Sequence, residues 1–183
     1  MIRTERLCLR APTPDDAEAL YRLFADAEVM HGLGREPVST VDDIHAIIEG
    51  MLADWSTEGI GAFVLETTGP DPQVAGQSGL MIFDVRDWTP STWSRAGRYA
   101  QPELGWALTR AFWGHGYATE AAAAIRDWAF EQPRIESLVS LISPANVRSQ
   151  RVAARLGAVP TVTVVPEDSK RTAIAWRYGT TRT

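Results

Sequence analysis

Residues 113–121 read Trp-Gly-His-Gly-Tyr-Ala-Thr-Glu-Ala. Gly114 and Gly116 stand directly before an alanine-rich stretch whose apolar residues repeat at helical spacing as far as Phe130. Residues 103–108, a few positions upstream, have the pattern of a β-strand. A strand, a glycine loop and a helix in this order predict a strand–helix unit of a mixed α/β fold. The unpaired N–H groups and the dipole at such a helix start favour an anion, and glycines let a phosphate approach the backbone closely.

The glycine motif alone leaves two interpretations open. It lacks the Gly-Lys-Ser/Thr ending of a P-loop. It also lacks the third glycine and the acidic residue about 20 positions further on that a dinucleotide-binding loop carries. A tight turn between strand and helix that binds no ligand is compatible with the same residues, so the motif by itself is a weak signal.

A second strand–helix unit follows. A short apolar strand is expected over residues 137–142, and residues 143–151 open a shorter helix that ends near Gly157. Asn146 is a natural N-cap, and Ser149 lies one turn further on the same side. Capping and solvent exposure are ordinary explanations for these two side chains. Because both units lie in the same half of the chain, we expect the two helices to start at one edge of the sheet and to frame one cleft.

The remaining elements complete one domain over residues 1–183. Helices are expected after the capping residues Thr13 and Thr40, and their apolar stripes are interpreted as core faces. A long loop is expected over residues 84–101. Further strands are expected over residues 62–66, 74–83, 159–165 and 172–178. This order predicts a mixed α/β sheet with helices on its faces.

Composition excludes several classes of protein. Of the 183 residues, 45% are hydrophobic and 22% are charged, which is typical of a folded globular chain. The net charge of 18 − 23 = −5 argues against a nucleic-acid partner. The single Cys8 permits no intramolecular disulfide and indicates a reducing compartment. No signal-peptide pattern, no apolar run of about 18 residues and no metal-ligand spacing are found, so we expect a cytoplasmic protein without a membrane partner or a metal.

Three motifs resemble the N-acetyltransferases of the GNAT superfamily, in particular the RimJ/RimL branch. They are Thr-Glu-Arg-Leu-Cys-Leu-Arg at residues 4–10, the loop at 113–121, and Asn-Val-Arg-Ser at 146–149 with Leu156-Gly157 after it. The resemblance spans most of the chain. It implies a mostly antiparallel twisted sheet of about seven strands with four flanking helices. It also implies that acetyl-CoA lies in a V-shaped splay between two central strands and is the acetyl donor.

The resemblance also implies which residues bind acetyl-CoA. Backbone N–H groups from His115 through Thr119 would hold the pyrophosphate, and backbone groups of Trp106 and Leu108 would pair with the pantetheine arm. Asn146 would contact the arm from the other side. Arg148, Arg151 and Arg155 would either meet the phosphates or form a solvated basic face. The expected cofactor-binding residues are Trp106, Leu108, Trp113, Gly114, His115, Gly116, Tyr117, Ala118, Thr119, Asn146 and Arg151.

This sequence departs from the superfamily pattern at three places. Trp113 stands where the loop usually begins with Arg or Gln, and Ala158 replaces the usual aromatic residue after Leu156-Gly157. The tyrosine that many members carry on the last helix is missing, since residues 150–158 contain none. The identity of the general acid is therefore open.

Acetyl transfer to an amine requires a base for the ammonium, a hydrogen-bond donor for the thioester oxygen and a proton for the thiolate. Glu103 is the candidate base, although an exposed strand-end carboxylate is an equal alternative. The N–H of Trp106 or Leu108 is the candidate donor, and Ser149 the candidate acid. The acceptor is expected to be a primary amine, either a protein N-terminal α-amine of the ribosomal-protein type or a small molecule such as an antibiotic. Two other functions remain open, a non-catalytic CoA-binding regulator and another nucleotide-binding module. The chain is expected to be a monomer or a homodimer.

Overall fold

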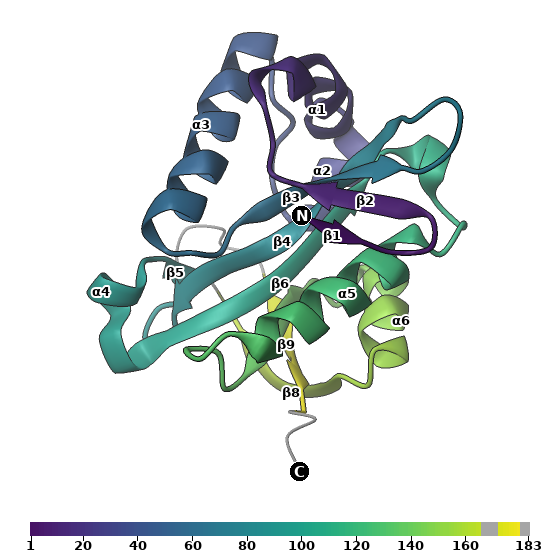
Figure 1. Cartoon of the computed structure of the whole chain (residues 1–183). Coiled ribbons are helices and arrows are strands. Elements are labelled where there is room, and N and C mark those ends of the chain that lie inside the picture. Colours follow the sequence, from purple (N-terminus) through teal and green to yellow (C-terminus); the bar gives the residue numbers. More distant parts are fainter. Residues whose placement is uncertain (166–171, 180–183) are drawn as a thin grey trace.

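The computed structural model of the chain describes residues 1–165 and 172–179, and one sheet organises them (Figure 1). Within these residues the sheet has nine strands in the order β1-β2-β3-β4-β6-β7-β9-β8, and β5 pairs with β4. The strands are β1 (Ile2–Arg3), β2 (Leu7–Arg10), β3 (Ala62–Thr67), β4 (Val74–Asp84), β5 (Thr89–Pro90), β6 (Ala100–Leu108), β7 (Leu138–Ile142), β8 (Val159–Val164) and β9 (Ala173–Tyr178).

The expected mixed, mostly antiparallel sheet is confirmed. Every neighbouring pair of strands is antiparallel except β6 and β7, which are parallel. The number of strands exceeds the predicted seven, since the described residues include β1 and β5, which have only two residues each. Such short pairings leave too few alternating residues for sequence periodicity to register.

Helices cover both faces of the sheet. They are α1 (Ala17–Phe24), α2 (Ala27–Leu33), α3 (Val41–Thr57), α4 (Trp93–Ala96), α5 (Tyr117–Glu131) and α6 (Val147–Arg155), with 3₁₀ turns at Pro14–Asp16, Gly97–Tyr99 and Arg110–Phe112. Helices α1, α2 and α3 lie on one side of the sheet and α5 and α6 on the other (Figure 1). Each side has its own core, with Leu20 and Ile44 in one and Ile125 and Leu104 in the other. Among the helices of the described part, none has the length and apolarity that a membrane span requires.

The structure corrects three expectations. Four flanking helices are expected, whereas the described residues contain six α-helices, because α2 and the four-residue α4 are not predicted. Asp26 caps the start of α2 by accepting from the Glu28 N–H, and Gly34 ends it in the left-handed region at φ 74°. The expected loop over 84–101 contains β5, α4 and the first residues of β6, because short elements there carry no clear period. The apolar stripe expected after Thr40 lies on α3 and includes Leu52, whose side chain is 37% exposed. Only part of that stripe therefore faces the core.

Strands β6 and β7 touch at one point and then part. Their register contains a single pair, Glu103 with Val139. Beyond it, side chains replace the ladder: the Leu141 N–H donates to Glu103 Oε1 at 3.2 Å, and the Ser140 hydroxyl donates to the Leu104 carbonyl. The central sheet is therefore held together at the base of a gap, and the sequence expectation of a splay between these two strands is met in the geometry.

Candidate active site

A cleft of about 580 Å³ opens at the C-terminal end of β6, beyond the point where β6 pairs with β7. It is lined by the end of β6, the loop that follows, the first turn of α5, one side of α6 and one side of α2. Eleven of the thirteen predicted site residues line it: Trp106, Leu108, Trp113, Gly114, Gly116, Tyr117, Ala118, Thr119, Asn146, Ser149 and Arg151. Glu103 and His115 are not among the lining residues.

Beyond Glu103, the edge of β6 that faces away from β4 has no strand partner and faces the cleft. The Thr109 N–H donates to the Ala75 carbonyl at 3.0 Å, so odd-numbered residues at this end of β6 bond to β4. The N–H groups of Trp106 and Leu108 consequently point toward the gap. The Leu108 carbonyl accepts from Trp113 Nε1 at 2.7 Å. The Leu108 carbonyl thus already has one partner and keeps one lone pair, while the Leu108 N–H is directed toward the gap.

The glycine loop presents the start of α5 to the cleft. Gly114 and Gly116 have φ values of 82° and 83°, a region in which a side chain is strained. Gly116 is the N-cap of α5, and the N–H groups of the first turn have no intrahelical partner. Opposite them, Arg148, Arg151 and Arg155 share one side of α6 and all line the cleft. A helix start and three guanidinium groups around one space suit a ligand with several phosphates.

His115 lies outside the cleft lining. Its carbonyl accepts from Arg6 Nη1 at 2.9 Å, and its ring stacks on that of Tyr117 with centroids 5.9 Å apart. The backbone of His115 is therefore held from behind the loop, and its imidazole packs against a neighbour.

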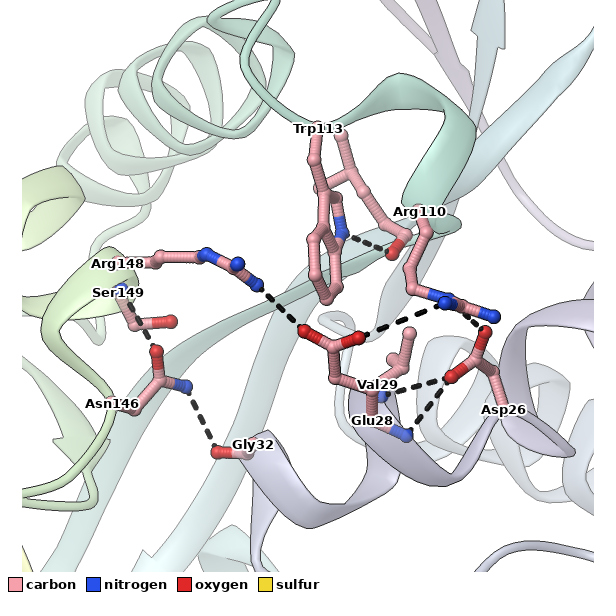
Figure 2. A network of polar contacts seen from close by, with 10 residues as sticks. Asp26, Glu28, Val29, Gly32, Arg110, Trp113, Asn146, Arg148 and Ser149 are labelled. Atoms are coloured by element: carbon pink, nitrogen blue, oxygen red, sulfur yellow. Dashed lines mark hydrogen bonds and ion pairs between the residues drawn. The ribbon is translucent and has the colours of Figure 1, made fainter.

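Helix α2 lines one side of the cleft, and Figure 2 shows its Glu28 and Gly32 facing Arg148 and Asn146 of the neighbouring wall. Glu28 forms ion pairs with Arg148 at 3.1 Å and with Arg110 at 3.7 Å, and Asp26 pairs with Arg110 at 2.6 Å. The Arg148 guanidinium also lies over the Trp113 ring at 4.4 Å. These contacts join α2 to both walls of the cleft. Sequence reasoning missed them because α2 itself was missed.

Both the oxygen and the nitrogen of the Asn146 side-chain amide form hydrogen bonds. Its Oδ1 accepts from the Ser149 N–H at 3.0 Å and caps α6, and its Nδ2 donates to the Gly32 carbonyl of α2 at 2.9 Å (Figure 2). One Nδ2 hydrogen is left over for a ligand. The Ser149 hydroxyl forms no hydrogen bond within the described residues, and it points from α6 toward the space between α6 and α2.

Glu103 lies at the closed end of the gap, on the fourth position of β6. Burial raises the pKa of its carboxyl to about 7, although the Leu141 N–H and the positive charge of Arg35 act in the opposite direction. A carboxyl with this pKa changes its protonation state near neutral pH, as a general base must. Gly105, on the same face of β6, leaves the room that the carboxylate occupies, because a Cβ there would lie 3.2 Å from Glu103 Oε2.

The raised pKa predicts that Glu103→Gln alters the pH dependence of stability. Between about pH 4.5 and 7 the folded chain keeps a proton that the unfolded chain has released, so wild-type stability should fall as pH rises through this window. Glutamine has no such proton to lose. The variant should gain up to about 3 kcal/mol relative to wild type between pH 4.5 and 8, measured by urea unfolding. Parallel pH profiles for the two proteins would contradict the burial of this charge.

The described residues contain no group of three or more His, Cys, Asp and Glu side chains that could hold a metal ion. Cys8 is buried on β2 as a free thiol.

Comparison with known proteins gives one family. Residues 6–159 match the family model described as acetyltransferase (GNAT) domain. A curated relative, the uncharacterized N-acetyltransferase p20 of Bacillus licheniformis, is 28% identical over 150 residues, which are 80% of this chain and 75% of that protein. The solved acetyltransferase of Agrobacterium tumefaciens str. C58 is 31% identical, with a TM-score of 0.77 over 98% of this chain and 94% of that one.

Two further solved structures differ in the acceptor that their descriptions name. The structure of a putative ribosomal-protein-serine acetyltransferase from Vibrio cholerae has a TM-score of 0.74 at 20% identity, covering 98% of this chain and 97% of its own. The aminoglycoside acetyltransferase AAC(6')-Ib, in complex with ribostamycin and coenzyme A, has a TM-score of 0.74 at 17% identity, covering 98% and 99%. At these identities the likeness shows the fold, which agrees with the fold that the three motifs imply.

Proposed function

Since the chain belongs to the GNAT acetyltransferases and is an acetyl-CoA-dependent N-acetyltransferase, we propose that it acetylates the α-amine of a protein N-terminus, as a member of the RimJ/RimL branch. One observation carries the proposal: the β6–β7 gap ends at a carboxyl whose pKa is about 7. The motif at residues 4–10 and the likeness to the V. cholerae structure support the branch.

The cleft fits acetyl-CoA along its length. The start of α5 and the arginines of α6 supply partners for phosphates, and the inward N–H groups of Trp106 and Leu108 supply partners for an extended arm with amide groups. From the loop at residues 113–119, an arm that follows β6 toward its N-terminal end passes Leu108, then Trp106, and ends near Glu103. When bound there, acetyl-CoA supplies an acyl thioester at the base of the gap.

We assign each step of the transfer to a residue of this chain. Glu103 takes the proton of the acceptor ammonium, directly or through a water molecule. The Trp106 N–H donates to the thioester oxygen as negative charge grows on it. The neutral amine then attacks the thioester carbon and the C–S bond breaks. The departing thiolate takes a proton through the Ser149 hydroxyl of the opposite wall, which regains its proton from water. Glu103 is thus the base, and Ser149 fills the role left open by the missing tyrosine.

The pKa of Glu103 favours an acceptor of low basicity. A base with a pKa of about 7 deprotonates an α-amine with a pKa near 8 at a cost of about 1.4 kcal/mol. For a lysine side chain with a pKa near 10.4, the cost is about 4.6 kcal/mol. An α-amine is therefore the better match, and a small-molecule amine of similar pKa is the second candidate, favoured by the likeness to the ribostamycin complex.

A turnover assay tests the acceptor class. Purified protein and acetyl-CoA are offered peptides with a free α-amine, the same peptides with a blocked α-amine and one free lysine, and aminoglycosides. We expect thiol release with the first set and none with the second. Turnover confined to aminoglycosides would move the assignment to the second candidate. Tight CoA binding without turnover on any acceptor would indicate a regulatory protein.

Ser149→Ala is expected to lower kcat more than it raises the KM for acetyl-CoA. The hydroxyl is proposed to act on the thiolate, which exists late in the reaction, so its loss should appear in kcat by about tenfold or more. Steady-state kinetics with one acceptor peptide measure the changes in kcat and in the KM for acetyl-CoA. Ser56→Ala, another helical serine outside the cleft, is the matched control and should match wild type. A rise in KM at constant kcat would instead identify Ser149 as a binding residue.

A further inference from the structure

Glu120 joins the first turn of α5 to the N-terminal strands. Its Oε1 accepts from Thr4 Oγ1 at 2.6 Å and from the Arg6 N–H at 2.8 Å, and its Oε2 accepts from Arg6 Nε at 2.7 Å. Figure 1 shows the turn between β1 and β2 beside this end of α5. One carboxylate thus fastens the chain near residues 4–6 to a helix 114 or more positions away in sequence.

The same guanidinium reaches the glycine loop. Arg6 Nη1 donates to the His115 carbonyl at 2.9 Å, and the guanidinium carbon lies 4.8 Å from the centre of the Tyr117 ring. A Cβ on Gly116 would lie 3.4 Å from Arg6 Nη2. Arg6 therefore contacts His115 and Tyr117 and lies beside Gly116 between them, although it does not line the cleft. It supports the loop from the side opposite the ligand.

Glu120 creates an electrostatic problem for a phosphate site. Burial would raise the pKa of its carboxyl, but hydrogen bonds from Thr4 and Arg6 outweigh burial and lower it, so the group is charged at neutral pH. A negative charge in the first turn stabilises a helix, yet it also repels an anion bound at the same helix start. The Arg6 guanidinium, 2.6 Å from Glu120 Oε2, supplies the offsetting positive charge.

We infer that Arg6 is a positioning residue for acetyl-CoA, which fixes the loop at residues 115–117 in its binding shape and cancels the charge of Glu120 beside the pyrophosphate. The inference rests on the proposed placement of the pyrophosphate at residues 115–119. It also gives a physical reason for two separate motifs to occur together, since residues 4–10 supply the guanidinium and residues 113–121 supply its partners.

Four proteins test the inference: wild type, Arg6→Met, Arg6→Met/Glu120→Gln and the control Arg10→Met. Arg10 lies on β2 and forms a comparable bidentate ion pair with Asp16 at 2.7 and 2.8 Å, outside the cleft. The Kd for CoA is measured by titration calorimetry at low salt. The kcat/KM values are compared for acetyl-CoA and for the acetyl thioester of pantetheine, which has no phosphates.

Arg6→Met should raise the Kd for CoA about tenfold or more, because the unpaired carboxylate then repels the pyrophosphate. The double variant should bind CoA at least about threefold more tightly than Arg6→Met, since it lacks that charge. The kcat/KM for the pantetheine thioester should stay within about twofold of wild type, and Arg10→Met should bind CoA normally. A double variant no tighter than Arg6→Met, or an equal loss with both thioesters, would overturn the inference and leave Arg6 a structural residue.

Failure of the proposed placement gives a different pattern. If Gly116→Val and Arg6→Met both bind CoA as wild type does, the pyrophosphate lies elsewhere. If Gly116→Val loses affinity while Arg6→Met retains it, the placement stands and the role of Arg6 is refuted.

Discussion

Glu103→Gln is expected to lower kcat/KM at pH 7 by about 10²–10³-fold, the largest effect of any single substitution considered for this chain. Glutamine keeps the shape of the side chain and can still accept from the Leu141 N–H, so the gap should keep its geometry. What it loses is a basic group with a pKa of about 7 at the closed end of the gap.

The pH profile separates a base from a merely structural carboxyl. With an α-amine acceptor the deficit should shrink above about pH 8, because the acceptor then arrives neutral, and with a lysine acceptor it should persist toward about pH 10. The measurement is kcat/KM from pH 6 to 9.5 for both proteins. Glu66→Gln, the same change on β3 outside the cleft, is the control. A constant ratio across the range would assign Glu103 to orientation of substrate or strand.

Gly116→Val is expected to weaken CoA binding by at least about tenfold, or 1.4 kcal/mol. The residue caps α5 at φ 83°, where a β-branched side chain is strained, and its Cβ would lie 3.4 Å from Arg6 Nη2, so the substitution should displace the loop that presents the first turn to the phosphate. Titration calorimetry with CoA measures the loss.

Gly59→Val is the matched control for backbone strain. Gly59 has a similar φ of 73° with open space around it, and it lies outside the cleft. Its substitution should cost comparable stability and leave CoA affinity unchanged. A folded Gly116→Val protein with wild-type affinity would refute the placement of the pyrophosphate.

Much of this arrangement was predictable because it depends on local rules. The strands and helices around residues 103–157 follow from periodicity, from the glycine loop and from the cap at Asn146, and eleven predicted residues meet in one cleft. Their meeting follows from topology, since both helices begin after parallel strands at one sheet edge.

The unpredicted part depends on contacts between distant segments. Helix α2 has only seven residues, and its role across the cleft comes from Glu28 and Gly32 meeting Arg148 and Asn146. The Arg6–Glu120 pair joins positions 114 apart, and no local pattern encodes such a partner. The cap at Asp26 and the glycine at position 34 were the available signals for α2.

The parting of β6 and β7 has a consequence for aggregation. An unpaired strand edge with free N–H groups can recruit strands from other chains. Here the free edge of β6 lies in a cleft that is also lined by α2, α5 and α6, so a polypeptide with side chains on both faces would meet these helices before it could pair. A slender chain that carries amides but no side chains enters without that obstacle. On the proposed placement, the cleft admits the narrow arm of a thioester substrate and hinders the pairing of β6 with a strand from a second copy of the chain.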